Sequence, residues 1–208
     1  MTRIANGGAR TYRSGLRAQQ ADETRVRILD ATVRVMARGV ASVSIPDVAR
    51  EAGVSVPTIY RHFGTKAELL AAVYPHLTHR TSLDAMVVPR SVDEFRDFVR
   101  SIFDRLDSFD DLARAAAASP AAEEARHVTM PDRLAMSRRF VETLAPTLPE
   151  VEQDRIARLL VVLTASSALR MWRDHLDASA DQAAEDIDWL LRTLLTAAAD
   201  PTNERPDR

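Results

Sequence analysis

The chain has 208 residues, of which 46% are hydrophobic and 28% charged, a composition that suits one domain or two small ones with a buried core. It has no cysteine, which excludes disulfides, thiolate metal sites and cysteine redox chemistry. No apolar run approaches the roughly 18 residues of a membrane span, and the N-terminus lacks the apolar stretch of a secretory signal. We therefore expect a cytoplasmic protein with no membrane partner.

The net charge of −2 conceals an uneven distribution along the chain. Residues 1–66 carry ten arginines and one lysine against five acidic residues, a net charge of +6. Residues 67–208 carry seventeen arginines against twenty-five acidic residues, a net charge of −8. A basic first third on an acidic remainder indicates that the first third meets a polyanion. A genome biased toward arginine codons explains the scarcity of lysine, but it does not explain this placement.

Residues 1–21 are polar and show no periodic apolar pattern. We expect a disordered basic arm, because such a segment buries too little apolar surface to fold alone. Arginine-bearing arms can enter an A·T-rich minor groove beside the main contact. Arg10, Arg13 and Arg17 are the candidates for this contact, and the alternative is a tail with no part in binding.

Four helices are expected next. Apolar residues recur from Asp22 at the spacing of one helix face: Val26, Leu29, Val33, Met36 and Val40. Gly39 can end this helix in a left-handed conformation. Each of the three that follow begins after a hydroxyl residue that can cap it: Ser44, Ser55 and Thr65. The helices that begin after Ser44 and Ser55 are short and are joined by a turn at Gly53. This pattern predicts a helix-turn-helix.

The second short helix, VPTIYRHF (residues 56–63), crowds polar and aromatic side chains into two turns. In a helix-turn-helix the start of this helix enters the major groove of DNA. Apolar side chains there can contact thymine methyl groups, and an arginine can donate two hydrogen bonds to guanine. Hydroxyl, imidazole and ammonium groups can bond phosphate. The N-terminus of a helix also favours a bound anion. The candidate DNA-binding residues are Ser44, Val56, Pro57, Thr58, Tyr60, Arg61, His62, Thr65 and Lys66.

Beyond Pro89 the pattern is again helical, and no strand signal is present. Helices are expected within residues 91–106, 109–120, 130–149 (bounded by prolines), 150–176 (one long helix) and 179–200. The C-terminal half has no pairing of a nucleophile with a base. His76 and His79 have a metal-like spacing but no nearby third ligand, so we expect the solvent-facing end of a helix there rather than a metal site.

The stretch SIPDVAREAGVSVPTIYRHFGTKAELL, from Ser44 to Leu70, resembles the DNA-binding domain of the tetracycline-repressor (TetR) family. The shared features are the Ala-Gly-Val-Ser turn, the Thr-x-Tyr-x-His-Phe helix, and the following lysine with its leucine run. The resemblance covers about residues 22–75. Pro46 departs from it, because some members carry a base-reading basic residue there, so direct readout here is expected to rely more on Arg61, Thr58 and the N-terminal arm. The residues that match family positions touching DNA are Thr58, Tyr60, His62 and Lys66.

The resemblance implies an all-α homodimer that binds a pseudo-palindromic double-stranded DNA operator. The expected organisation is an N-terminal three-helix helix-turn-helix DNA-binding domain (22–75) joined to a C-terminal helical ligand-binding and dimerisation domain (76–200). The arm (1–21) precedes them and a flexible tail (201–208) follows. The last two long helices are expected to pair with a second chain, with interface residues Leu163, Ser167, Ile187, Leu191 and Leu194.

The resemblance also implies a pocket for an apolar or amphipathic small-molecule effector in the C-terminal domain. The candidate lining residues are Phe103, His127, Met136, Phe140, Arg170 and Trp172, and the alternative for this set is plain core. We expect no cofactor, no bound metal and no enzymatic activity.

Three functions are open to this sequence. The first is a repressor that an effector releases from DNA, as the resemblance implies. The second is a DNA-binding regulator without an effector, controlled by a protein partner or by its own level. The third is an all-α enzyme with an incidentally basic N-terminus, which no constellation of residues supports. A duplex-binding assay separates the third from the others, and a screen for compounds that release DNA separates the first from the second.

Overall fold

The computed structural model describes residues 8–82 and 86–199, with side chains from Ala18 onward. Within these residues every regular element is a helix, which confirms the predicted all-α class. The helices are α1 (Gly8–Ala37), α2 (Ile45–Ala52), α3 (Val56–Phe63), α4 (Lys66–Arg80), α5 (Val92–Asp107), α6 (Asp111–Ala118), α7 (Ala121–Leu144), α8 (Glu150–Leu163), α9 (Ser166–Arg170), the π-helical turn η2 (Met171–His175) and α10 (Ala180–Ala199). None of these helices is long and apolar enough to cross a lipid bilayer.

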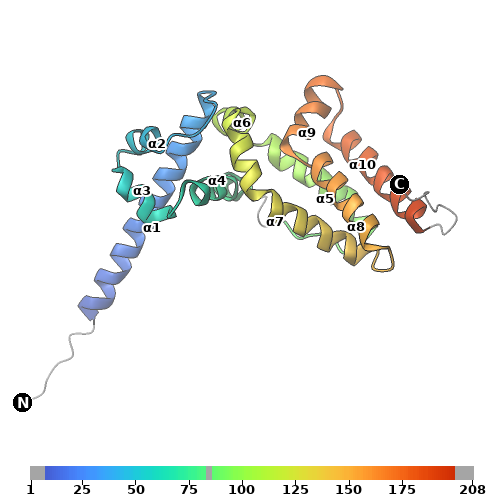
Figure 1. Ribbon diagram of the computed structural model, residues 1–208, viewed down its shortest axis with the longest axis horizontal. Helices are drawn as coiled ribbons and strands as arrows, with labels where there is room; N and C mark the ends of the chain where they lie inside the picture. The colour runs from blue at the N-terminus through green and yellow to red at the C-terminus, as the bar shows by residue number, and fades with distance from the viewer. Residues whose placement is uncertain (1–7, 83–85, 200–208) are drawn as a thin grey trace, which may run out of the picture. The chain divides into compact units, whose positions relative to one another are not determined.

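The helices form two compact units. Unit 1 comprises the chain up to His76 together with Asp111–Ala125, and unit 2 comprises Leu77–Asp110 and the chain after Ala125. The sequence predicts one boundary near residue 75, whereas in the structure α6 returns to pack against α1 (Figure 1). The buried residues of α6 are Ala113 and Ala116, whose small side chains leave room for a neighbouring helix. Unit 1 is therefore built from two separate stretches of the chain.

The first helix begins at Gly8, not at Asp22. The expectation that residues 1–21 form a disordered arm is therefore wrong for residues 8–21. The physical reason is that this stretch contains several alanine, arginine and glutamine residues, which are good helix formers. Extending an existing helix costs far less than starting one. Residues 1–7 lie outside the described residues, as do the side chains of Arg10, Arg13 and Arg17.

The core of unit 1 lies between α1 and the three helices that follow it. Leu29, Val33 and Met36 are buried on α1, as the periodicity predicts, but Val26 is 48% exposed, so the inward face does not extend to it. The short helix α2 buries one face through Ile45, Val48, Ala49 and Ala52. Helix α4 contributes Leu69, Leu70 and Val73. These buried residues of α1, α2 and α4 form the core of unit 1, on which α3 packs.

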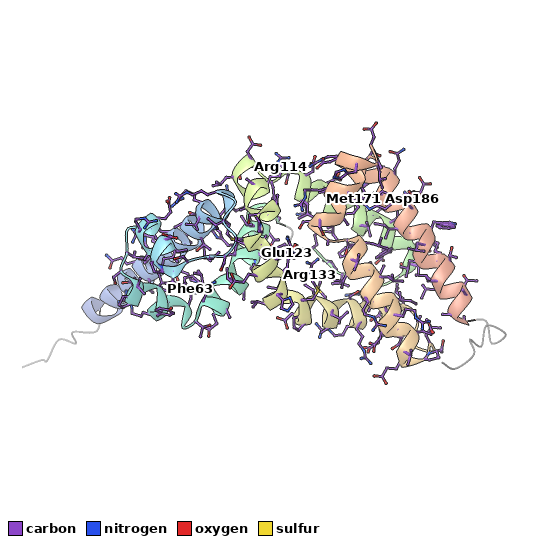
Figure 2. The ribbon with its side chains drawn as sticks, turned by 45° about the horizontal axis from the view of Figure 1, so that its top comes forward. Phe63, Arg114, Glu123, Arg133, Met171 and Asp186 are labelled. Carbon is purple, nitrogen blue, oxygen red and sulfur yellow. The ribbon has the colours of Figure 1, made fainter. Side chains whose placement is uncertain are left out.

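Unit 2 is centred on α5, which packs against α10. Phe95, Val99 and Phe103 are buried on α5. The rings of Phe95 and Phe140 are stacked, with centroids 5.3 Å apart and planes 19° apart. Figure 2 shows the side chains of this unit, with Met171 labelled on η2 and Asp186 on α10.

Two predicted helix boundaries in unit 2 are wrong. Pro131 does not begin a helix but lies inside α7, which absorbs the loss of one backbone hydrogen bond within its 24 residues. The predicted long helix over 150–176 is interrupted after Leu163, where Ala165 is extended. Thr164 bonds its own hydroxyl back to the carbonyl oxygen of Leu160, at 2.8 Å. Threonine and serine side chains compete for backbone groups in this way, which favours ending a helix.

Candidate nucleic-acid interface

The turn between α2 and α3 is made by Gly53, which adopts φ 64° and ψ 37°. This left-handed conformation is costly for residues with a side chain and easy for glycine. The Gly53 amide donates to the Arg50 carbonyl oxygen at 3.3 Å, and the Val54 amide donates to that of Ala49 at 3.0 Å. These two hydrogen bonds terminate α2, and α3 begins at Val56. The predicted helix-turn-helix is present.

The start of α3 is capped by Ser55. Its hydroxyl oxygen accepts a hydrogen bond from the Thr58 amide at 3.3 Å, and lies 2.9 Å from the Thr58 hydroxyl oxygen. Ser55 therefore acts as predicted, and the Thr58 hydroxyl keeps only part of its bonding capacity for another molecule. Pro57 is exposed and Val56 is half-buried, so the first turn presents apolar surface beside this cap.

The two faces of α3 differ sharply. Ile59 and Phe63 are its only buried residues, and both point into the core of unit 1. On the other side Tyr60 is 45% exposed and Arg61 is exposed. Neither of these two side chains has a hydrogen bond or ion pair with any described residue. Their polar ends are therefore available to another molecule.

His62 follows them and is half-buried. Burial lowers the pKa of its imidazole, and the positive charges of Arg61 and Arg25 lower it further. The ring is accordingly neutral at neutral pH, with one nitrogen that donates and one that accepts. An anion placed beside it would favour the protonated form instead.

Lys66 forms an ion pair with Glu124, which the sequence does not mark as its partner. Its Nζ lies 2.7 Å from Oε1 of Glu124, on the first turn of α7, and donates to Oγ of Ser42 at 3.1 Å. Ser42 in turn donates to the other carboxylate oxygen of Glu124 at 3.1 Å. Burial raises the pKa of Glu124, but the hydrogen bonds from Lys66 and Ser42 outweigh it, so the net shift of that pKa is downward. The predicted phosphate contact is thus paired inside unit 1.

The other two predicted caps differ from each other. Ser44 precedes α2, but its side chain makes no capping hydrogen bond, so the prediction that its hydroxyl caps the helix is wrong. Thr65 does cap α4: its Oγ1 accepts from the Glu68 amide at 3.1 Å and donates to the Glu68 carboxylate at 3.3 Å. Of the two hydroxyls, that of Ser44 is the more available for a phosphate.

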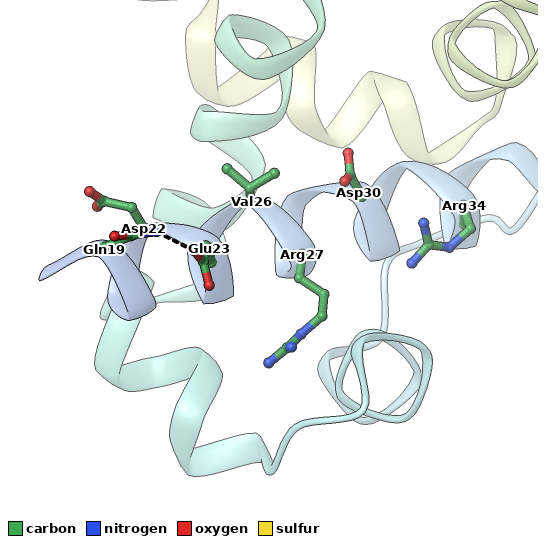
Figure 3. A pocket seen from close by; sticks show the side chains of 7 residues that line it. All are labelled: Gln19, Asp22, Glu23, Val26, Arg27, Asp30 and Arg34. Atoms are coloured by element: carbon green, nitrogen blue, oxygen red, sulfur yellow. Dashed lines mark hydrogen bonds between the residues drawn. The ribbon is translucent and has the colours of Figure 1, made fainter. Parts of the chain in front are cut away.

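A shallow groove of about 460 Å³ runs along α1 (Figure 3). Three of the residues that line it are acidic and two are basic, so this groove has no excess of positive charge to attract DNA phosphate. The lining residues are Gln19, Asp22, Glu23, Val26, Arg27, Asp30 and Arg34. The exposed face of α3 is therefore the better candidate for a polyanion than the groove on α1.

The residues predicted for an effector pocket do not share one environment. Phe103 and Phe140 are buried in the core of unit 2, whereas His127 and Met136 are exposed. Arg170 and Trp172 are half-buried. A groove of about 540 Å³ lies elsewhere in unit 2, between α5 and the segment before it. Its lining residues are Met86, Val87, Val88, Pro89, Arg90, Glu94, Asp97, Phe98, Ser101 and Arg105.

The residues predicted for a dimer interface need correction. Ile187 and Leu191 are fully buried within the chain, on the helix that packs against α5, so their side chains are not accessible to a second chain. Leu163 and Leu194 are half-buried, and Ser167 is exposed. The predicted residues Ile187 and Leu191 lie on the inward face of α10, whereas Trp189 on the same helix is 66% exposed. The large exposed apolar residues from α8 to α10 are Val151, Leu159, Val162, Met171, Leu176 and Trp189.

Comparison with known proteins agrees with this geometry. Residues 28–73, which span most of α1 through α4, match the family described as "Bacterial regulatory proteins, tetR family". This stretch of the chain is therefore similar to the TetR family. Among curated TetR-family relatives, the transcriptional regulator SrpR of Pseudomonas putida is 43% identical over 68 residues, or 32% of each chain. The transcriptional regulator TtgR of the same species is 44% identical over 64 residues, 29% of this chain and 30% of that one.

These relatives are named as transcriptional regulators, not as enzymes, and the chain matches about a third of their length. A solved TetR-like structure matches more of the chain at lower identity. NalD of Pseudomonas aeruginosa superposes with a TM-score of 0.57 and 21% identity, over 84% of this chain and 96% of that one. This likeness shows a shared fold: an N-terminal helix-turn-helix followed by a C-terminal helical domain.

Proposed function

We propose that this chain is a DNA-binding transcriptional regulator that reads the major groove with α3. The observation that carries the proposal is the exposure of Tyr60 and Arg61, without internal partners among the described residues, on a helix that follows the Gly53 turn and packs on unit 1 through its opposite face. An exposed arginine on such a helix suits bidentate bonding to guanine O6 and N7. Pro57 and Val56 supply apolar surface for a thymine methyl group at the start of the helix.

The regulator is proposed to act as a homodimer on a pseudo-palindromic operator. Two copies of a short recognition helix reading successive major grooves require two-fold symmetry in both protein and DNA. The exposed apolar side chains of α8 and α10 support a partner surface in unit 2, because isolated soluble chains seldom expose several large apolar groups together. Val162 and Trp189, each 66% exposed, are its proposed anchors.

The regulator is further proposed to be a repressor that a small molecule releases from DNA. NalD is described as "the secondary repressor of MexAB-OprM multidrug efflux pump", which makes repression the first role to test. The effector is proposed to be apolar or amphipathic and to bind in unit 2. Release requires only that it binds more tightly to a form of the dimer that fits the operator poorly. A DNA-binding regulator without an effector is the alternative.

The proposal is tested by selecting duplexes from a random library with the purified protein and measuring affinity by fluorescence anisotropy. We expect an inverted repeat among the selected duplexes. Arg61→Ala should cost about 1–3 kcal/mol on the selected duplex and relax the preference at one base pair of each half-site. Equal weakening on a scrambled duplex would show that Arg61 does not read bases. Failure to enrich any sequence would contradict the DNA-binding function, and a broad compound library that releases no DNA would favour the effector-free alternative.

A further inference from the structure

The attachment of α3 to unit 1 is slight for a helix that has to be held at a defined angle. It has eight residues and buries only Ile59 and Phe63. A helix of two turns is unstable by itself in water, so its position depends on what holds it. The carbonyl groups of its last turn also lack partners within the helix. What contacts this last turn therefore determines where Arg61 and His62 point.

Arg25 of α1 contacts the last turn of α3 in two ways. Its guanidinium carbon lies 4.3 Å from the centroid of the Phe63 ring. Its Nη1 donates a hydrogen bond to the backbone carbonyl oxygen of His62 at 3.0 Å. A cation over an aromatic face is attracted to it, and a cation beside the C-terminal end of a helix is favoured by the helix dipole. One side chain thus contacts both a core ring and a carbonyl oxygen for which the described residues supply no other recorded partner.

We propose that Arg25 is a positioning residue for base reading: it fixes the last turn of α3, and with it Arg61 and His62, against α1. The inference rests on the proposed DNA-binding function and deepens it. Bidentate bonding to a base edge depends on the direction of the arginine as well as on its charge. Losing the two Arg25 contacts should therefore reduce the preference for the selected sequence more than it reduces affinity for DNA of any sequence.

A phosphate contact by Arg25 is the competing role, and α1 supplies a matched control for it. Arg25 is half-buried and both its contacts are internal. Arg27, two residues further on, is exposed and has no hydrogen bond or ion pair within the described residues. Its side chain lines the groove on α1 (Figure 3). Replacing Arg27 removes the same charge from the same helix, and among the described residues it removes no hydrogen bond, ion pair or ring contact to α3.

The test compares Arg25→Met, Arg25→Lys and Arg27→Met with the unmodified chain. Methionine keeps the apolar stem and removes the charge and donors, and lysine restores a cation without the planar fork. Affinity is measured for a duplex selected by the unmodified protein and for a scrambled duplex of the same length, over a range of salt. We expect Arg25→Met to lower the ratio of the two affinities by about tenfold and to leave the salt dependence unchanged. Arg25→Lys should recover part of this ratio, and Arg27→Met should preserve it.

A second readout needs no DNA. Amide hydrogen exchange at the end of α3 reports on its last turn, because the Gly64 amide donates to the Tyr60 carbonyl oxygen at 2.8 Å. We expect Arg25→Met to speed exchange at residues 60–64 and to leave α2 and α5 protected. Faster exchange throughout unit 1 would overturn the proposal, because Arg25 would then be a general stability residue.

Two further results would overturn it. The first is equal weakening on both duplexes with a salt slope flattened by about one unit per protomer, the signature of a phosphate contact. The second is an unchanged affinity ratio together with unchanged exchange at residues 60–64. If the unmodified chain selects no duplex at all, the proposed function fails, and the exchange measurement still decides whether Arg25 holds α3.

Discussion

Lys66 Nζ lies 2.7 Å from Oε1 of Glu124, so the cation at the start of α4 is neutralised by a residue on the first turn of α7. Ser42 bonds both partners and completes a closed group of three. A DNA phosphate near α4 would have to compete with Glu124 for Lys66. The side chains of both charged partners are about a third exposed, which makes such an exchange inexpensive.

Removing the carboxylate should therefore strengthen DNA binding. We expect Glu124→Gln to raise affinity about two- to fivefold on selected and scrambled duplexes alike, because a pair this exposed is worth about 0.5–1 kcal/mol. The salt dependence should steepen, since Lys66 would then neutralise a phosphate. Lys66→Met provides the control: in that background Glu124→Gln should change nothing. An effect that persists without Lys66 would show that Glu124 acts through another group.

Operator binding should depend on pH through His62. Burial and the neighbouring arginines lower its pKa in the unbound chain, whereas a phosphate beside it would raise that pKa. Binding would then take up a proton, so affinity should rise as pH falls through the raised pKa of the complex and level off below the lowered pKa of the unbound chain. Affinity titrations from pH 5 to 8 test this, near the ordinary histidine pKa of about 6.5. His62→Gln should remove the dependence, and a slope unaltered in that variant would assign it to another group.

Dimerisation should depend on the outward row of α10 and not on its inward row. We expect Trp189→Glu and Val162→Glu to yield folded monomers in sedimentation experiments, because each places a charge on an exposed apolar site. Leu191→Ala is the contrasting variant. It should lower the free energy of unfolding by about 2–5 kcal/mol by leaving a cavity at a fully buried position. Folded dimers in both glutamate variants would move the interface elsewhere.

The angle between α2 and α3 should depend on Gly53. An added Cβ would meet no atom within 4 Å, so Gly53→Ala introduces backbone strain at φ 64° and no collision. We expect a loss of about 1–2 kcal/mol in unfolding free energy and weaker binding to the selected duplex. Gly39→Ala is matched to it, with φ 75° and equally open surroundings at the end of α1. That variant should lose similar stability without losing sequence preference. The same loss of preference in both variants would make the effect one of stability alone.

Features set by neighbouring residues could be predicted from the sequence. The Gly53 turn, the Ser55 cap and the inward placement of Ile59 and Phe63 all follow from local patterns, and all are present. The exposed face of α3 is the side opposite Ile59 and Phe63. These features also define the candidate interface. Its main residues could therefore be predicted from the sequence alone.

Features that depend on distant parts of the chain were not predicted. The pairing of Lys66 with Glu124 joins two helices far apart in sequence, and nothing local signals it. The burial of Ile187 and Leu191 was misassigned because a row of apolar residues does not say whether its partner is α5 or a second chain. The helical start of α1 was missed because an arm without apolar periodicity can still extend a helix that is anchored further along.

The return of α6 to α1 has a consequence for how the protein is made. Unit 1 needs residues 111–125, so a ribosome that has released only the first 76 residues has not released all of the unit that contains α3. The α1 surface that α6 covers stays open until the intervening segment has been synthesised, and closing that loop carries an entropy cost that local helix formation does not. Fragments that end near residue 76 should consequently be prone to aggregation, whereas those that extend past Ala125 should not.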